Sequence, residues 1–125
     1  MITVEDILQL HTLSINKYGG SHGLRDEGLL LSAIARPYQT FDGIELCLTV
    51  HDKAAAIMES LIINHAFVDG NKRIGYLAMF TVLKFGGFRL TASEEDAYNF
   101  TISISTGETK FEQIVEWLKQ NTTSL

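Results

Sequence analysis

The stretch that decides the fold is Thr49–Arg73, which reads TVHDKAAAIMESLIINHAFVDGNKR. A helix is expected to begin after Thr49, because an acidic residue follows three positions later, as in a capping box. Apolar residues recur at helical spacing and cover much of the circumference, which predicts a central helix that ends near Ala66. A loop is expected over Phe67–Gly70, with Asn71 as the cap of the next helix.

Helical patterns precede this stretch. One helix is expected between an N-cap at Thr3 and an end near Tyr18. Another is expected to begin at Asp26 and must stop before Pro37. The segment Tyr38–Leu48 contains an Asp-Gly pair, which favours a turn, so it predicts a small hairpin or an extended flap. An irregular connector fits the same pattern equally well.

Helical patterns also follow the central stretch. The helix after Asn71 is expected to end at Gly86-Gly87, and Phe88–Leu90 predicts a short extended piece. Two closing helices are expected, capped by Ser93 and by Thr109. About six helices and almost no strand predict an all-α fold, a compact helical bundle with a short flap or hairpin before the central helix.

Composition narrows the class of protein. The chain has 125 residues, near the commonest domain size, so one domain over residues 1–125 is expected. A net charge of −5 argues against direct binding to nucleic acid or to an anionic membrane surface. The lone Cys47 excludes an internal disulfide and fits a reducing compartment. The first residues lack a signal-peptide pattern and the apolar stretches are too short to span a bilayer, so a cytoplasmic protein is expected.

The nine residues His65–Arg73 carry the candidate chemistry. The free N–H groups and the dipole at a helix N-terminus attract an anion. Lys72 and Arg73 oppose that dipole, and two cations fit there if a phosphate neutralises them. Asp69 can hold a magnesium ion that bridges phosphate oxygens, and His65 can accept a proton near neutral pH.

Each of these residues also has an ordinary explanation. His65 alone fits a histidine at a helix end, Asp69-Gly70 an ordinary turn, and the Lys-Arg pair a solvated surface. Their conjunction within nine residues favours a phosphate site. The other three histidines, His11, His22 and His51, lack the spacing of metal ligands and are expected to be structural or surface residues.

This stretch resembles the signature of the Fic family, H-P-F-x-[DE]-G-N-G-[KR]-x-x-R. Three positions depart from it: Ala66 replaces the proline, Lys72 the second glycine, and Tyr76 the final arginine. The form with Asn-Lys-Arg is similar to the death-on-curing branch of that family. The similarity to this branch covers almost the whole chain, including Lys17–Gly20, Leu24–Leu29, Ala35–Pro37, Gln39–Phe41, Lys53–Ala56 and Gly87–Leu90.

The resemblance implies a Fic-like helical fold and a role for each motif residue. His65 would take the proton from a serine or threonine hydroxyl of a target protein, and Asp69 would bind Mg²⁺. Phe67 would anchor the loop in the core. The phosphates of a nucleotide would be bound by Gly70, Asn71, Lys72 and Arg73, with Lys72 and Arg73 also acting in catalysis.

The resemblance also implies which group is transferred. In the death-on-curing branch the γ-phosphate of ATP moves to a threonine of elongation factor Tu, which arrests translation. A toxin with protein kinase activity is therefore expected. The flap residues Thr40, Phe41, Ile44 and Leu46 would pair with the target backbone, a form of strand addition.

Self-inhibiting Fic proteins carry [ST]-x-x-x-E-[GN], but Glu27-Gly28 here is preceded by Gly23 at the required position. The resemblance thus implies a separate antitoxin of the prevent-host-death type. Two alternatives stay open. One is transfer of AMP to a protein hydroxyl. The other is a non-catalytic module that binds an antitoxin peptide, for which a His65→Ala variant would keep its whole biological effect.

Overall fold

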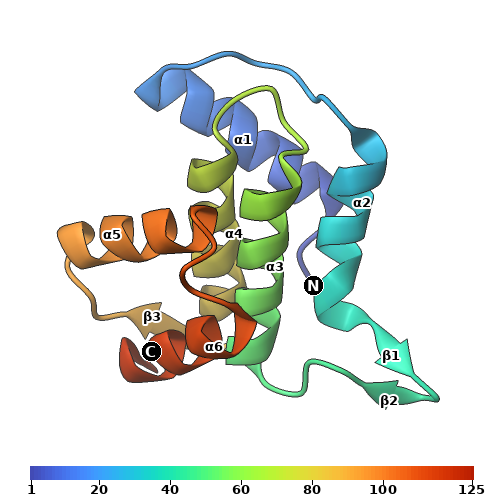
Figure 1. Ribbon diagram of the computed structural model, residues 1–125, viewed down its shortest axis with the longest axis vertical. Helices are drawn as coiled ribbons and strands as arrows, with labels where there is room; N and C mark the ends of the chain where they lie inside the picture. The colour runs from blue at the N-terminus through green and yellow to red at the C-terminus, as the bar shows by residue number, and fades with distance from the viewer.

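A computed structural model describes the whole chain, residues 1–125 (Figure 1). It contains six α-helices, one short 3-10 helix and two pairs of short strands. This architecture confirms the predicted helical bundle with a hairpin before the central helix. The elements in chain order are α1 (Val4–Tyr18), α2 (Glu27–Ala35), η1 (Arg36–Tyr38), β1 (Thr40–Phe41), β2 (Ile44–Glu45), α3 (Val50–Asn64), α4 (Asn71–Phe85), β3 (Phe88–Leu90), α5 (Glu94–Ser105), α6 (Phe111–Gln120) and β4 (Thr122–Ser124).

Helices α3 and α4 lie side by side at the centre of the molecule, and the other helices surround them (Figure 1). Three consecutive alanines of α3, Ala54–Ala56, are fully buried. The two helices approach closely at Gly75, where an added Cβ would lie 2.5 Å from Cγ1 of Ile62. Because small residues line this contact, one continuous core of 23 buried residues forms around the helix pair.

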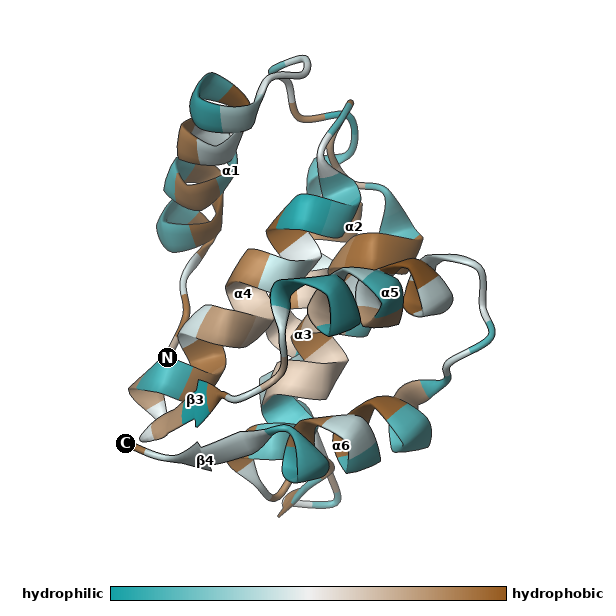
Figure 2. Cartoon of the chain, turned by 90° about the vertical axis from the view of Figure 1, so that its left-hand side faces the viewer, coloured by the Kyte–Doolittle hydropathy of each residue, from teal (hydrophilic) through white to brown (hydrophobic).

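Figure 2 shows the same arrangement by hydropathy. The ribbons of α3 and α4 are pale or brown over much of their length, whereas the outer helices α5 and α6 alternate between hydrophilic and hydrophobic colours. This alternation is typical of helices with one face on the core. None of the helices is both long enough and apolar enough to cross a membrane.

Four of the predicted helix caps are confirmed. The side chains of Thr3, Asp26, Thr49 and Ser93 each accept a hydrogen bond from a backbone N–H in the first turn of α1, α2, α3 and α5. Two further caps, Asn71 and Thr109, were predicted wrongly.

Asn71 is the first residue of α4, and Gly70 is its N-cap. The prediction was wrong because the Asn71 side chain bonds backward to the loop. Its Oδ1 accepts from the N–H of Phe67 at 3.0 Å, and its Nδ2 donates to the Phe67 carbonyl at 3.0 Å. Asn71 therefore closes the loop before the helix instead of capping the helix.

Thr109 does not cap α6, whose N-cap is Lys110. The Thr109 hydroxyl instead donates to Oγ of Ser103 at 2.7 Å, which ties it to the end of α5. Gln113 takes over at α6, because its Oε1 accepts from the Lys110 N–H at 2.8 Å. The helix thus begins one residue later than the sequence pattern indicated.

The flap is a β-hairpin. Thr40 pairs with Glu45 and Phe41 with Ile44, and the turn residues Asp42 and Gly43 have φ angles of 53° and 77°. Positive φ at both positions gives a turn whose twist matches that of paired strands. The sequence left two interpretations open, a hairpin and an irregular connector, and the structure shows the hairpin.

The sequence pattern did not indicate β4. Thr122–Ser124 pairs antiparallel with the predicted extended piece Phe88–Leu90, and Thr122 lies opposite Leu90. Nε2 of His51 lies 2.8 Å from Oγ1 of Thr122 and links the strand to α3. The chain end therefore packs onto the bundle at the N-terminal end of α3.

Candidate active site

The motif His65–Arg73 forms the tight loop between α3 and α4 and the first turn of α4. Helix α3 ends at Asn64 because the backbone of His65 turns into the left-handed region, with φ 53° and ψ 50°. At the other end of the loop, Gly70 is also left-handed, with φ 75°, and leads into α4. Glycine adopts this conformation without steric cost, whereas histidine does not.

Phe67 fixes the loop to the core. Its side chain is buried and stacks on the imidazole of His11 from α1, with ring centroids 3.8 Å apart and 12° between the planes. Nε2 of His11 lies 2.8 Å from the carbonyl oxygen of Asp69, an acceptor, so this nitrogen carries the proton. His11 therefore holds the loop at two points.

The sequence pattern did not indicate that His11 contacts the motif. A structural or surface residue was predicted, and His11 is a structural one, only 3% exposed. The spacing Ile7, His11, Ile15 on one face of α1 was the available signal that His11 is buried. Nothing in that spacing indicates which loop it contacts, because the contact is 58 residues away in the chain.

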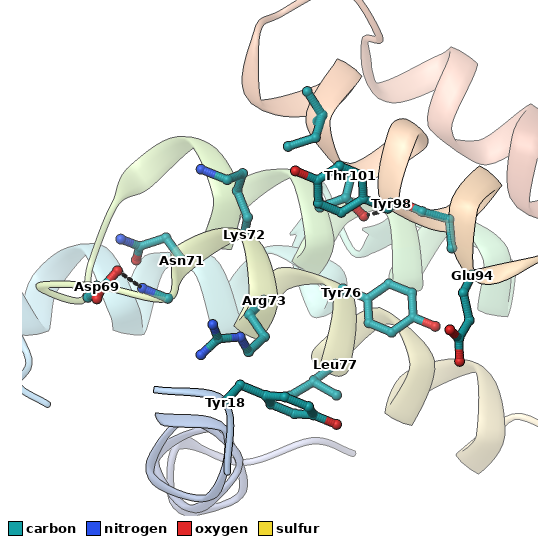
Figure 3. Close-up of a pocket in the computed structure, with 13 residues that line it drawn as sticks. Tyr18, Asp69, Asn71, Lys72, Arg73, Tyr76, Leu77, Glu94, Tyr98 and Thr101 are labelled. Carbon is teal, nitrogen blue, oxygen red and sulfur yellow. Dashed lines mark hydrogen bonds between the residues drawn. The ribbon is translucent and has the colours of Figure 1, made fainter. Parts of the chain in front are cut away.

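The carboxylate of Asp69 is exposed and hydrogen-bonded on both oxygens. Oδ2 accepts from the N–H of Ser21 at 3.0 Å. Oδ1 accepts from the N–H of Gly70 at 2.8 Å, and Figure 3 shows this second bond as a dashed line. These two bonds, first that of Ser21, lower the pKa of Asp69, and the charge of Arg73 adds to the effect. Asp69 is thus an anion throughout the neutral range.

The two cations of the motif have different surroundings. The guanidinium of Arg73 donates to the carbonyl of Gly19 at 3.0 Å and of Ser14 at 3.3 Å, at the end of α1, and lies 5.4 Å from the ring centroid of Tyr18. Lys72 is exposed and forms neither a hydrogen bond nor a salt bridge. Both side chains thus keep their positive charge beside the start of α4, Arg73 held by carbonyl oxygens of α1 and its end, and Lys72 without a partner.

A cavity of about 610 Å³ opens beside this loop. One end is lined by the motif segment Asp69–Arg73, the other by Tyr76 of α4 and by Glu94 and Tyr98 of α5 (Figure 3). The phenol of Tyr76 points toward Glu94, and burial, followed by the charge of Glu94, raises its pKa. The cavity thus has a polar end at the start of α4 and an aromatic end between α4 and α5.

The sequence of the chain is similar to that of a known protein family. The model of the Fic/DOC family matches residues 1–83, well over half of the chain. This chain belongs to the Fic/DOC family. Its relatives place it in the Doc branch.

Two of these relatives carry informative names. The Toxin Doc of Mycolicibacterium smegmatis (strain ATCC 700084 / mc(2)155) is 43% identical over 88 residues, which are 70% of this chain and 65% of the toxin, just under two thirds of its length. The protein kinase doc of Escherichia phage P1 is 27% identical over 119 residues, 95% of this chain and 93% of that protein.

Within this Fic/DOC chain, the structure brings together only part of the predicted site. Asp69, Gly70, Asn71, Lys72 and Arg73 line one cavity. His65 does not line it: it lies at the opposite end of the loop, exposed, and its imidazole forms no hydrogen bond.

The flap lies apart from the motif. Figure 1 shows the β1–β2 hairpin beyond the N-terminal end of α3, whereas the motif loop follows its C-terminal end. Helix α3 has 15 residues, so it separates the two by roughly 22 Å at 1.5 Å per residue. Phe41, Ile44 and Leu46 are exposed there.

Proposed function

We propose that this chain is a Doc toxin that transfers the γ-phosphate of ATP to a hydroxyl group of a protein. The observation that carries the proposal is the exposed, unpaired Lys72 at the start of α4, beside an ionised Asp69 and the cavity. The names of the two relatives, toxin and protein kinase, point the same way. By resemblance to the death-on-curing branch, the target is a threonine of elongation factor Tu, and the consequence is arrested translation.

The phosphates of ATP bind over the first turn of α4. The free backbone N–H groups there carry the positive end of the helix dipole, which attracts an anion, and Gly70 is the left-handed N-cap that leads into them. Lys72 adds a full charge that no protein group neutralises. Positively charged, preorganised donors of this kind stabilise the charge of a phosphoryl group in transfer.

Asp69 fits a magnesium ion bound together with ATP. No three His, Cys, Asp or Glu side chains stand close enough to hold a metal by themselves. Magnesium requires no such cluster, since it takes one or two carboxylates and completes its shell with phosphate oxygens and water. The Asp69 carboxylate is ionised and exposed, with lone pairs left beside its two hydrogen bonds. The ion would neutralise charge on the phosphates when bound.

His65 is the base in this proposal. Its imidazole is exposed and free of other partners, so a hydroxyl of a docked protein can reach it. The hydroxyl proton moves to the imidazole as the hydroxyl oxygen forms a bond to the γ-phosphorus. The bond from that phosphorus to the bridging oxygen breaks, and ADP leaves. Positioned proton transfer contributes a factor of roughly 10²–10⁴ to such reactions.

Lys72 favours γ-phosphate transfer over transfer of AMP. The corresponding glycine of the Fic signature leaves space for departing diphosphate, whereas the Lys72 side chain takes part of that space. Tyr76 replaces the signature's last arginine and its charge at the outer phosphates, and its phenol faces Glu94. Nucleotidyl transfer is the second candidate, since the Asp-Gly-Asn core of the signature is intact.

Two protein partners belong to the proposed function. A separate antitoxin of the prevent-host-death type neutralises the toxin in the cytoplasm, since the chain lacks the self-inhibiting pattern. The target docks on the flap, whose apolar side chains Phe41, Ile44 and Leu46 are exposed on a two-stranded edge. A protein as large as elongation factor Tu can contact both the flap and the motif loop.

The test uses ATP labelled either at the γ-phosphate or at the α-phosphate. Purified chain, magnesium and elongation factor Tu are incubated with each, and label on the factor is counted. We expect label only from the γ position. Label from the α position would replace the kinase with a nucleotidyl transferase, and label from neither would remove this target. Co-expression with the antitoxin should abolish the transfer.

A further inference from the structure

His65 has an unusual backbone conformation. Only two residues other than glycine have positive φ in this chain, His65 and Asp42, and Asp42 belongs to the hairpin turn. A left-handed histidine persists only where its surroundings hold it. The imidazole of His65 forms no hydrogen bond, so the direction in which it leaves the chain is set by its backbone.

Arg25 holds this backbone from the side. Its Nε donates to the carbonyl oxygen of His65 at 2.7 Å, and its Nη2 to the carbonyl oxygen of Asn64 at 3.2 Å. Both carbonyls lie at the C-terminal end of α3, where the helix leaves its acceptors unpaired and its dipole favours a cation. The planar guanidinium can reach two such acceptors at once, which a lysine ammonium cannot do in the same geometry.

The strand-like segment around Arg25 keeps its guanidinium in place. The backbone N–H groups of Arg25 and Asp26 both donate to the carbonyl of Ala66, at 2.8 and 3.0 Å. The N–H of Val68 donates to the carbonyl of Gly23 at 3.0 Å. These bonds do not involve the Arg25 side chain, so they remain when that side chain is shortened.

We infer that Arg25 is a positioning residue for His65, an inference that rests on the proposed role of His65 as the base. Arg25 holds the carbonyls of Asn64 and His65 so that the imidazole of His65 points at the hydroxyl to be phosphorylated. It acts through His65 and contacts neither ATP nor target. Arg25 is itself exposed and has no part in the core, so its replacement leaves the core intact.

The first test is kinetic, on the full chain with ATP, magnesium and elongation factor Tu. Arg25→Ala should lower kcat by about 10- to 100-fold, the effect of a slightly misplaced catalytic group, and leave the KM for ATP unchanged. Arg25→Lys should fall between Arg25→Ala and wild type. Arg89→Ala is the matched control, because Arg89 is exposed and forms no side-chain hydrogen bond or salt bridge. An unchanged kcat for Arg25→Ala overturns the inference, as does a loss that comes from a higher KM for ATP.

The second test does not depend on activity. In the chain labelled with ¹⁵N and ¹³C, the Cα and Cβ chemical shifts and the three-bond HN–Hα coupling of His65 report its φ. Wild type and Arg89→Ala should show the left-handed values, and Arg25→Ala should lose them while the core signals stay in place. Unchanged His65 values in Arg25→Ala overturn the inference. A wild-type chain that modifies no target while this experiment gives the expected result means that the proposed function failed and the positioning did not.

Discussion

Among single residues, the two neighbouring cations at the start of α4 differ in their partners. Arg73 donates to carbonyls at the end of α1, whose dipole favours a cation, whereas Lys72 has no partner. An unpaired cation in the first turn of a helix costs roughly 0.3–1 kcal/mol. No protein group in the structure offsets this cost, and in the proposed function a phosphate of ATP does so.

Replacing Lys72 by alanine should therefore separate activity from stability. We expect phosphoryl transfer to fall by about 10²–10³-fold, as for the loss of one donor to a transition-state oxygen. The free energy of unfolding should stay the same or rise slightly, because an unfavourable charge at the α4 N-terminus is removed. Urea denaturation and the rate of label transfer measure the two effects. Lys84→Ala, at the exposed other end of α4, should retain activity, and a Lys72→Ala variant that is fully active contradicts the assignment.

At the scale of elements, the contact between α3 and α4 sets the position of the motif loop. An added Cβ at Gly75 would lie 2.5 Å from Cγ1 of Ile62 and 3.1 Å from the carbonyl oxygen of Met58. The first atom can move with its side chain, but the second belongs to the backbone of α3. Any side chain at position 75 must therefore push the two helices apart, and with them the two ends of the loop.

Gly75→Ala should destabilise the chain although alanine favours helix. Overpacking a buried site costs about 1–3 kcal/mol, and the gain in helix propensity is about 1 kcal/mol, so we expect a net loss of up to about 2 kcal/mol. Gly28→Ala on α2 is the control, since its added Cβ meets only Oδ1 of Asp26 at 3.4 Å. That variant should gain about 0.5–1 kcal/mol. Equal effects of the two substitutions in urea denaturation would show that the α3–α4 contact is loose.

The attachment of β4 should depend on pH. Burial lowers the pKa of His51 below its ordinary 6.5, with a contribution from Lys119, so the folded chain takes up this proton less readily than the unfolded chain. The contribution of neutral His51 to stability is present above pH 6.5 and is lost as the pH falls below it. Unfolding curves at about pH 7.5 and about pH 5.5 should differ more for wild type than for His51→Gln, which cannot titrate. An identical pH dependence of both chains would contradict this.

At the scale of the whole molecule, the core and the proposed working surfaces are separate. The 23-residue core surrounds α3 and α4, while Lys72, His65 and the flap lie outside it. Motif loop and flap occupy opposite ends of α3 (Figure 1). We therefore expect substitutions outside the core to change the proposed target recognition and the proposed phosphoryl transfer independently.

A flap variant should show this separation. Phe41 is 74% exposed and Ile44 66% exposed, so the double substitution Phe41→Ser, Ile44→Ser should leave the thermal midpoint unchanged. The KM for elongation factor Tu should rise about tenfold, the effect of 1.4 kcal/mol of lost contact, with the KM for ATP unchanged. Phe85→Ser is the matched control, because Phe85, the last residue of α4, is 63% exposed. A flap variant with the wild-type KM for the target would exclude the flap as its docking surface.

The sequence was most informative where local chemistry decides the structure. Thr3, Thr49 and Ser93 cap their helices as predicted, because a cap depends on residues three positions apart. The prediction was wrong at Asn71, whose side chain bonds to the Phe67 backbone, and it did not include β4. The β4 pairing joins residues that are far apart in the chain, which no local pattern reveals.

The candidate site shows the same contrast between local sequence signals and contacts from distant parts of the chain. The residue types of the motif indicated an anion site, and Asp69–Arg73 do line one cavity. The contacts that hold the loop come from His11, the Ser21 amide and Arg25, all from the first 25 residues of the chain. Spacing could indicate that His11 is buried, but only the packing of α1 against the loop shows what it touches.

The measurement that tests the central claim most directly is the intact mass of elongation factor Tu after incubation with the chain, ATP and magnesium. We predict a gain of one phosphoryl group with wild type and with the control His22→Ala, and no gain with His65→Ala. His22 is exposed, and its imidazole hydrogen-bonds to Oδ1 of Asn16. An equal gain with His65→Ala would show that His65 is not the base. A gain of the mass of AMP, or no gain with the wild-type chain, would contradict phosphoryl transfer to this target.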